Sequence, residues 1–328
     1  MIYADHAATT KTSRAAKEAM IACMEEHWGN PSSLYTLGQE ANELLQSARE
    51  RIAGCIGAAA REIYFTSGGS EADNQAIRSA AYWGARRGKK HIISSAIEHH
   101  AVLHTLERLK EEGFEITLLP VGEEGIVKVS DVAAALREDT ALVTIMYANN
   151  EIGTLQPIRE IGALCREKKV LFHTDAVQAV GHVPVDVQAD QIDMLSLSGH
   201  KFCGPRGVGA LYVRQGLPLR SLIEGGAQER GKRAGTENLP AIVGMATALE
   251  ESCAHMDGDA AHMSTLRDHL IAGISQIPHS ALNGSCDHRL PGNVNFCFEG
   301  IEGESLLLLL DDRGICASSG SACTSGSL

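Results

Sequence analysis

Apolar positions along the chain alternate between two spacings, and this pattern predicts an α/β protein. Short runs rich in β-branched residues, typical of buried strands, begin at Ile63 and lie at residues 91–96, 115–121, 141–148, 170–175, 193–197 and 210–213. Between these runs, apolar residues recur every three or four positions, as on one face of a helix, at residues 13–27, 37–55, 100–112 and 158–168. Such alternation predicts a mostly parallel sheet with helices on both faces.

The pattern changes in the last third of the chain. Helices are expected at residues 239–255 and 260–277, followed by a break at 278–291, a strand at 293–298 and a Leu-rich helix at 303–312. We therefore expect a large domain over residues 16–250 and a smaller α+β domain over residues 251–328. Residues 1–15 form an N-terminal segment that is expected to pack with the small domain.

Composition narrows the class of protein. A hydrophobic content of 44% and 33 glycines in 328 residues suit a globular α/β enzyme with many tight turns. The formal net charge of −12 opposes direct binding to nucleic acid or to an anionic membrane, and no apolar run approaches a membrane span, so a cytoplasmic protein is expected. The nine cysteines include no CxxC pair, which argues against a disulfide framework or an intrinsic metal site.

Polar residues gather where the predicted strands end, and in parallel sheets these ends share one edge. Lys201 follows one such strand within the sequence SGHK, a setting in which a lysine can join a carbonyl as a Schiff base. Asp175 could keep the ring nitrogen of pyridoxal phosphate protonated, His99 could stack on the ring, and Asn150 and Gln178 could contact its phenolic oxygen. Each residue alone also fits an ordinary cap, turn or surface position.

A phosphate cradle is predicted where the strand beginning at Ile63 passes through two glycines into a helix. Gly69 and Ser70 open that helix, and amide groups at a helix N-terminus bind anions. An ordinary strand-to-helix connection with a serine cap is the alternative. The Gly-rich stretch 225–238 likewise reads either as a flexible loop or as a loop that contacts an anion or a second subunit.

The chain closes on CASSGSACTSGSL, where Cys323 stands among small polar residues. This surrounding is unlike that of a core cysteine and favours an exposed thiol that carries a group to another site. An accidental surface cysteine is the alternative.

Together these stretches resemble the cysteine desulfurases of the group that includes the NifS and IscS proteins, pyridoxal-phosphate enzymes of fold type I within the class V aminotransferases. The resemblance runs nearly end to end. It rests on the motifs DHAATT, GNPSS, FTSGGSEADN, EHHAV, NNEIG, HTDAVQAVG, SLSGHKFCGPRGVGALYVR, ERGKRAGTEN and SSGSACTSGSL. The resemblance implies a large domain built on a mostly parallel seven-stranded sheet flanked by helices.

The resemblance also implies roles for individual residues. Lys201 would hold pyridoxal phosphate, with Cys323 as the sulfur acceptor and His99 as a proton relay; the cofactor-binding set would be Gly69, Ser70, His99, Asn150, Asp175, Gln178, Ser198, His200, Lys201 and, across a homodimer interface, Thr236. The implied reaction converts L-cysteine to L-alanine and a persulfide on Cys323. The sulfur would pass to an iron–sulfur scaffold or another acceptor, such as one serving tRNA thiolation, and Cys323 could ligate a transferred cluster.

Two expectations qualify this resemblance. Family members continue beyond Cys323 with helices and a strand that complete the small domain, including the arginine expected to clamp the substrate carboxylate, so the small domain is expected to be C-terminally incomplete here. Asn30 is a further candidate for that contact. A selenocysteine lyase, another class V pyridoxal enzyme, or a dimeric sulfur-transfer scaffold without full catalysis therefore remain alternative functions.

Overall fold

A seven-stranded sheet forms the centre of the computed structural model, which describes residues 1–320. Its strands lie in the order β2-β8-β7-β6-β5-β3-β4. They are β2 (Ile63–Thr66), β3 (His91–Ser95), β4 (Glu115–Leu119), β5 (Thr140–Thr144), β6 (Leu171–Asp175), β7 (Met194–Ser198) and β8 (Gly209–Val213). β8 pairs antiparallel with both β2 and β7, and the other neighbouring strands of this sheet pair in parallel, so the predicted mostly parallel, seven-stranded sheet is confirmed.

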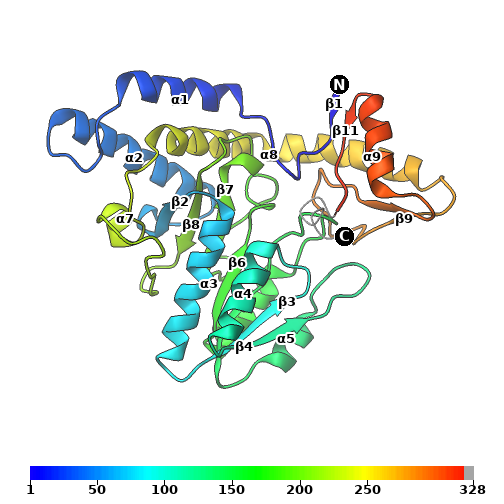
Figure 1. The fold of residues 1–328 in the computed structure, drawn as a ribbon, viewed down its shortest axis with the longest axis horizontal. Helices are drawn as coiled ribbons and strands as arrows, with labels where there is room; N and C mark the ends of the chain where they lie inside the picture. The colour runs from blue at the N-terminus through cyan, green and yellow to red at the C-terminus, as the bar shows by residue number, and fades with distance from the viewer. Residues whose placement is uncertain (321–328) are drawn as a thin grey trace.

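Helices cover both faces of the sheet (Figure 1). Those of the first half are α1 (Arg14–Glu26), α2 (Thr36–Cys55), α3 (Gly69–Ala85), α4 (His100–Glu111), α5 (Val129–Ala135) and α6 (Ile158–Lys168). The apolar sides of α3 and α4 belong to one buried cluster, and those of α2 and α6 belong to another. Because both faces are covered, β3, β5, β6, β7 and β8 are buried along their whole length, which explains their apolar runs without strict alternation.

The long helix α8 (Leu239–Ile274) corrects one sequence-based expectation, because it is continuous where two helices were predicted. Gly258 lies at the expected break, yet it stays helical and has open space where a side chain would be. A glycine in an exposed helix costs only about 1 kcal/mol, which a 36-residue helix tolerates. The boundary predicted at residue 251 therefore falls inside a helix, and the division into domains stays a prediction.

The remaining elements lie beside the C-terminal half of α8 (Figure 1). They are the antiparallel pair β9 (Ser280–Leu282) and β10 (Phe296–Phe298), the helix α9 (Gly303–Asp312), and β11 (Ile315–Cys316). The strand β9 lies within the stretch that the sequence showed as a break. At the start of the chain, β1 (Ile2–Tyr3) pairs in parallel with β11, so the first residues lie against the last described ones.

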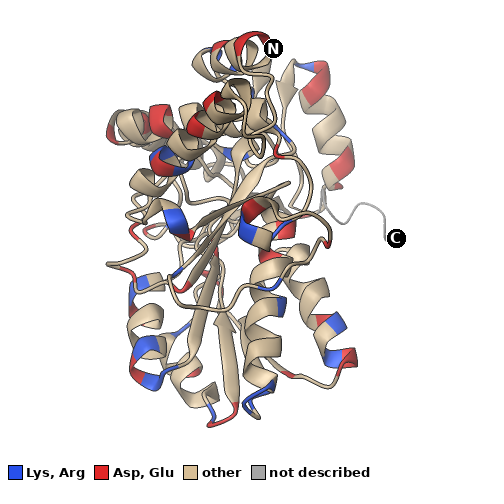
Figure 2. Ribbon diagram, turned by 90° about the vertical axis from the view of Figure 1, so that its left-hand side faces the viewer, with Lys and Arg blue, Asp and Glu red and all other residues tan. Residues whose placement is uncertain are grey.

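Acidic and basic residues are interspersed along the outer helices in the view of Figure 2. Across residues 1–320, no helix combines the length and the apolar character that crossing a membrane requires.

Candidate active site

A cavity of about 460 Å³ lies at the carboxyl ends of the central strands. Asp175 ends β6, Ser198 ends β7, and both line it. Of the predicted cofactor residues, all but Thr236 line this cavity: Gly69, Ser70, His99, Asn150, Asp175, Gln178, Ser198, His200 and Lys201. The structure thus brings together residues that span more than 130 positions of sequence, as the strand-end rule predicts.

Lys201 ends a single 3-10 turn, Gly199–Lys201, directly after β7. Its amine Nζ donates to the carbonyl oxygens of Ala7 at 2.5 Å and Ala8 at 3.0 Å. Gln178 Nε2 also donates to the Ala7 carbonyl, at 2.9 Å. The N-terminal segment therefore closes one side of the cavity and holds the lysine amine, a contact that the local sequence around Lys201 does not reveal.

Asp175 and His99 face the lysine from neighbouring elements. Burial raises the pKa of Asp175, whereas the amide of Val177 and the charge of Lys201 oppose this shift and favour the carboxylate. Asp175 Oδ1 also accepts a hydrogen bond from the amide of Val177 at 2.9 Å. Burial lowers the pKa of His99, and its Nδ1 accepts the amide hydrogen of Ala101 at 3.1 Å at the start of α4. His99 is therefore a neutral imidazole whose remaining proton sits on Nε2.

The start of α3 forms an anion-binding cradle. Gly68 precedes the helix with φ of +154°, and no side chain caps the first amides. A Cβ atom at Gly69 would lie 2.6 Å from Cγ2 of Val177, so the backbone here approaches its neighbours as only glycine allows. Ser70, Ser198 and His200 flank this helix start and also line a second opening, shared with Arg206, of about 330 Å³. Free helical amides beside a guanidinium fit a phosphate group.

Two further buried carboxyls lie close to the cavity. Burial, with a smaller contribution from Asp175, raises the pKa of Asp73 well above its usual range, and burial raises the pKa of Glu98 to about 8. Glu98 Oε1 accepts hydrogen bonds from Ser95 Oγ at 2.5 Å and from the amide of Met146 at 3.0 Å. The sequence placed Glu98 at a strand end without assigning it a role. Sequence reasoning missed Asp73. The one feature that could have revealed it is an acidic residue among the alanines of a helix face that is buried.

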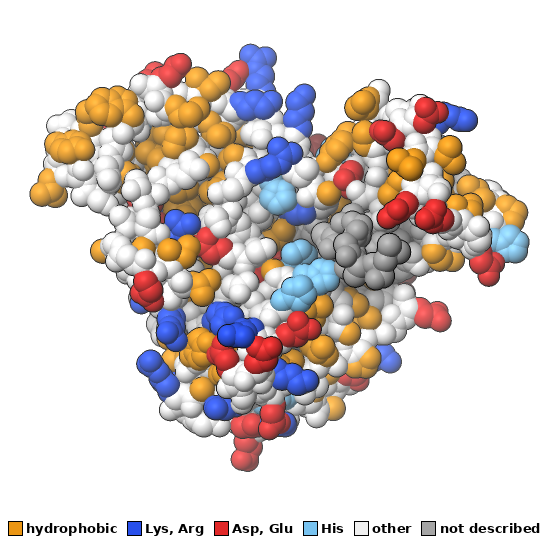
Figure 3. All heavy atoms as spheres, in the orientation of Figure 1, with side chains coloured by type: hydrophobic (Ala, Val, Ile, Leu, Met, Phe, Trp, Pro, Cys, Tyr) orange, Lys and Arg blue, Asp and Glu red, His pale blue; other side chains and the backbone are white. Residues whose placement is uncertain are grey.

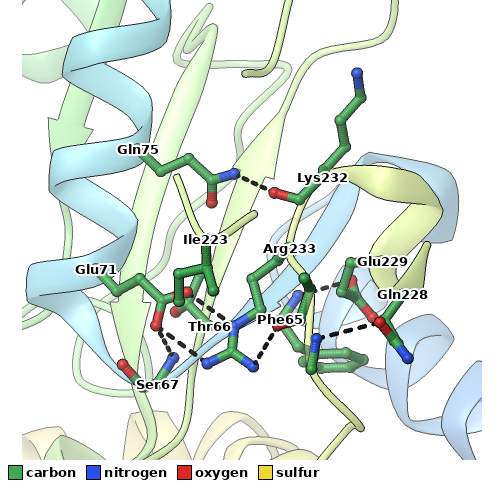
Figure 4. A network of polar contacts seen from close by, with 12 residues as sticks. Phe65, Thr66, Ser67, Glu71, Gln75, Ile223, Gln228, Glu229, Lys232 and Arg233 are labelled. Atoms are coloured by element: carbon green, nitrogen blue, oxygen red, sulfur yellow. Dashed lines mark hydrogen bonds and ion pairs between the residues drawn. The ribbon is translucent and has the colours of Figure 1, made fainter. Parts of the chain in front are cut away.

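Thr236 lines a separate pocket of about 70 Å³ beside β2. Its loop is anchored rather than free, because Arg233 Nε donates to Glu71 Oε1 at 3.0 Å and Gln75 Nε2 donates to the Lys232 carbonyl at 2.7 Å (Figure 4). Of the sequence alternatives for residues 225–238, the flexible loop is therefore wrong. The contact of Thr236 with a cofactor in a second subunit stays a prediction.

Among the other predicted residues, Asn30 does not line the cavity. Asn30 is exposed between α1 and α2, where its Oδ1 accepts the amide hydrogen of Ser32 at 3.0 Å. Cys323 lies outside the described residues. Gly320, the last described residue, lines the cavity together with Ala317, Ser318 and Ser319. Asn293 and Asn295 also line the cavity, and the side-chain amides of both donate to the Glu151 carbonyl.

Comparisons with known proteins agree with this geometry. The family model for aminotransferase class-V matches residues 2–328. "Cysteine desulfurase IscS" of Methanosarcina thermophila is 53% identical over 327 residues, which cover all of this chain and 81% of that protein, and the protein of that name from Clostridium botulinum is 53% identical over 330 residues and 83% of its length. Among solved structures, a "NifS-like protein" is 39% identical with a TM-score of 0.94, over 97% of this chain and 87% of the other. A second structure, "SspA in complex with cysteine", is 37% identical with a TM-score of 0.87, over 100% and 91%.

A half-buried lysine, a facing carboxylate and a helix-start cradle at the strand ends of this fold define an enzyme of the pyridoxal-phosphate type. The chain belongs to the aminotransferase class-V family, within the group of the cysteine desulfurases related to NifS and IscS.

Proposed function

We propose that the protein is a cysteine desulfurase that uses pyridoxal phosphate to take sulfur from L-cysteine, releasing L-alanine and leaving a persulfide on Cys323. The observation that carries the proposal is the convergence of Lys201, Asp175 and His99 on one cavity beside an anion cradle. The names of its relatives support the same activity.

The residues present fit pyridoxal phosphate. Lys201 would hold its aldehyde carbon, Asp175 would face its ring nitrogen, and the start of α3 with Ser70, Ser198 and His200 would hold its phosphate. Burial, together with the charges of Lys201 and Arg206, lowers the pKa of His200 to about 4, so this imidazole is neutral at pH 7 and serves as a hydrogen-bonding group. When bound, the cofactor supplies an electron sink for negative charge that develops on the substrate.

The chain's own residues then divide the work of proton and sulfur transfer. Lys201 Nζ would take the proton from the substrate Cα, and the carbonyls of Ala7 and Ala8 would orient that amine. His99 is fixed through Nδ1, so its Nε2 is the atom that would exchange a proton with the substrate. The Cys323 thiolate would attack the substrate sulfur, forming an S–S bond as the Cβ–S bond breaks.

The proposal includes a homodimer of the chain. Large apolar side chains gather on α1 and on the connection from α1 to α2, at the upper left of Figure 3, and Trp28 and Leu34 are 71% and 90% exposed. Such a patch on a protein surface marks an interaction site. A second copy of the chain would cover it and would bring Thr236 to the neighbouring cofactor. The sulfur acceptor would be a protein, such as an iron–sulfur scaffold.

The unchanged protein and three variants test the proposal. The purified protein supplied with pyridoxal phosphate is expected to absorb in the visible range and to release alanine from cysteine in the presence of a thiol reductant. Lys201→Ala is expected to abolish both the absorption band and the activity, and Lys11→Ala, a change of an exposed lysine, is the matched control. Cys323→Ser is expected to keep the absorption band and lose sulfur transfer.

Mass spectrometry after exposure to cysteine completes this experiment. One added sulfur atom is expected on the peptide that contains Cys323 and on no other peptide. A protein that binds the cofactor but leaves cysteine intact would instead support the scaffold function. Failure to bind the cofactor would overturn the proposal altogether.

A further inference from the structure

Two cysteines from distant parts of the sequence meet where α2 crosses α8. Cys55 is the last residue of α2, and Cys253 lies on α8 one turn beyond Leu249, the last buried residue of that helix. The two side chains line the same cavity, and both pack against the same hydrophobic cluster. The crossing of the two helices brings these cysteines together, and no local sequence motif predicts it.

A neighbouring ion pair holds the two helices in register. One turn before Cys55, Arg51 Nη2 donates to Glu250 Oε2 at 2.6 Å and to Thr247 Oγ1 at 3.2 Å. Residues 51 and 250 therefore face each other one turn before residues 55 and 253 do. Because α2 and α8 also pack into one buried cluster, the two thiols stay near each other while the helices are folded.

The thiol pair is open to small molecules. Cys55 and Cys253 line a cavity of about 320 Å³ on the side of the protein, together with Tyr147, Pro184 and Asp186. No residue of this cavity lines the cofactor cavity described above. Both thiols are half-buried, whereas Cys23 and Cys165 are fully buried.

The pair also has a defined order of reactivity. The neighbouring Cys55 lowers the pKa of Cys253, and Cys253 in turn raises the pKa of Cys55. The thiolate is the reactive form of cysteine, so Cys253 is the attacking sulfur.

We propose that Cys55 and Cys253 form a reversible dithiol–disulfide site that reacts with peroxides, separate from the site of sulfur transfer. The Cys253 thiolate attacks one oxygen of hydrogen peroxide, so that an S–O bond forms, the O–O bond breaks, and the released hydroxide takes up a proton to give water. The Cys55 sulfur then attacks the sulfenic sulfur, forming the S–S bond as the S–O bond breaks and a second water leaves. The two cysteines are oxidised, the peroxide is reduced, and a small dithiol reductant restores both thiols.

The disulfide would tie the end of α2 to α8 at the place where α8 leaves the buried core. Because nearly 200 residues separate the two cysteines in the sequence, the cross-link removes much conformational freedom from the unfolded chain. Oxidation is therefore expected to raise the midpoint of thermal unfolding, and reduction is expected to lower it again.

Peptide mapping of the full chain tests the site. The protein carries Cys323→Ser, so that this thiol does not react, and it is treated with hydrogen peroxide and digested without reduction. We expect one cross-linked peptide joining Cys55 to Cys253, lighter by two hydrogens than its parts, and the loss of two titratable thiols per chain. Dithiothreitol is expected to restore both thiols.

Single substitutions supply the controls. Cys55→Ser and Cys253→Ser are each expected to abolish the cross-link and the shift in thermal midpoint, whereas Cys286→Ser, a change of an exposed cysteine elsewhere, should leave both unchanged. The proposal is overturned if Cys55 and Cys253 stay reduced while Cys286 and Cys297 react, or if each is oxidised singly to a sulfinic acid. If a variant fails to fold, the peptide map of the parent protein decides alone. None of these results depends on cofactor binding or desulfurase activity.

Discussion

The buried ion pair between Arg49 and Glu229 makes the stability of the loop that contains Thr236 directly testable. The two side chains are 5% and 1% exposed, and they meet through two hydrogen bonds, Nη1–Oε2 at 2.8 Å and Nη2–Oε1 at 2.7 Å. Arg49 Nη1 also donates to the Ile63 carbonyl at 2.7 Å, and Glu229 Oε2 accepts from the amide of Phe65 at 2.9 Å. The pair therefore joins α2, the edge strand β2 and the loop that contains Thr236.

Replacing Arg49 with methionine keeps the length and the helix preference of the side chain but removes its charge. Glu229 would then stay buried with one amide donor, and removing one partner of a buried pair costs about 3–5 kcal/mol. Glu229 and Arg230 both have left-handed backbone, with φ of 48° and 58°. The ion pair of Arg49 with Glu229 therefore also helps to hold this strained part of the loop in its conformation. We expect Arg49→Met to lower the free energy of unfolding by an amount within that range.

Urea unfolding of the cofactor-free protein measures this loss. The control is Arg51→Met on the same helix, because the ion pair of Arg51 with Glu250 is 29% and 56% exposed and should contribute less than about 1 kcal/mol. Adding Glu229→Gln to Arg49→Met should recover part of the loss, since it removes the unpaired charge. Equal effects of Arg49→Met and Arg51→Met would refute the reasoning.

Two other substitutions test the site itself. Because burial raises the pKa of Glu98 from 4.5 to about 8, the folded protein keeps a proton that the unfolded chain releases, and stability should fall by about 1.4 kcal/mol per pH unit as pH rises through this interval. Glu98→Gln should remove that slope from urea unfolding of the cofactor-free protein between pH 5 and 8, and an unchanged slope would show that Glu98 titrates normally. At Gly209, a Cβ atom would lie 2.6 Å from the Leu197 carbonyl oxygen and 2.7 Å from Gly68 Cα, so Gly209→Ala should cost about 1–3 kcal/mol and weaken cofactor binding. The control Gly54→Ala, in open space on α2, should be neutral or stabilising by up to about 1 kcal/mol; matching effects would argue against crowding.

Local patterns predicted much of the large sheet and its helices. Ser13 caps α1 by accepting the amide hydrogen of Ala16, and α6 has the bounds that its spacing predicted. The strand-end rule then collected most of the cavity residues, because it depends on the order of strands and helices and not on side-chain detail. These features need only information that lies within about twenty residues of sequence.

Contacts between distant segments were beyond local patterns. The carbonyls of Ala7 and Ala8 hold an amine about 190 positions away, and nothing in MIYADHAATT identifies that partner. The prediction of a helix break near Gly258 was wrong, because the weak preference of glycine against helix did not interrupt α8. The short strand β9 was missed because its three residues are stabilised by pairing with β10.

Three buried carboxyls around one cavity raise the question of which one carries negative charge. Burial raises the pKa of Asp73, Glu98 and Asp175 alike, and each of the first two is further raised by the charge of Asp175. Of the three, only Asp175 has its pKa lowered by the amide of Val177 and by the charge of Lys201. These surroundings favour ionisation of Asp175 over ionisation of Asp73 and Glu98. A ligand that brings a positive ring nitrogen into this cavity would meet one carboxylate at the end of β6, and the cost of burying that charge would be offset by the ligand itself.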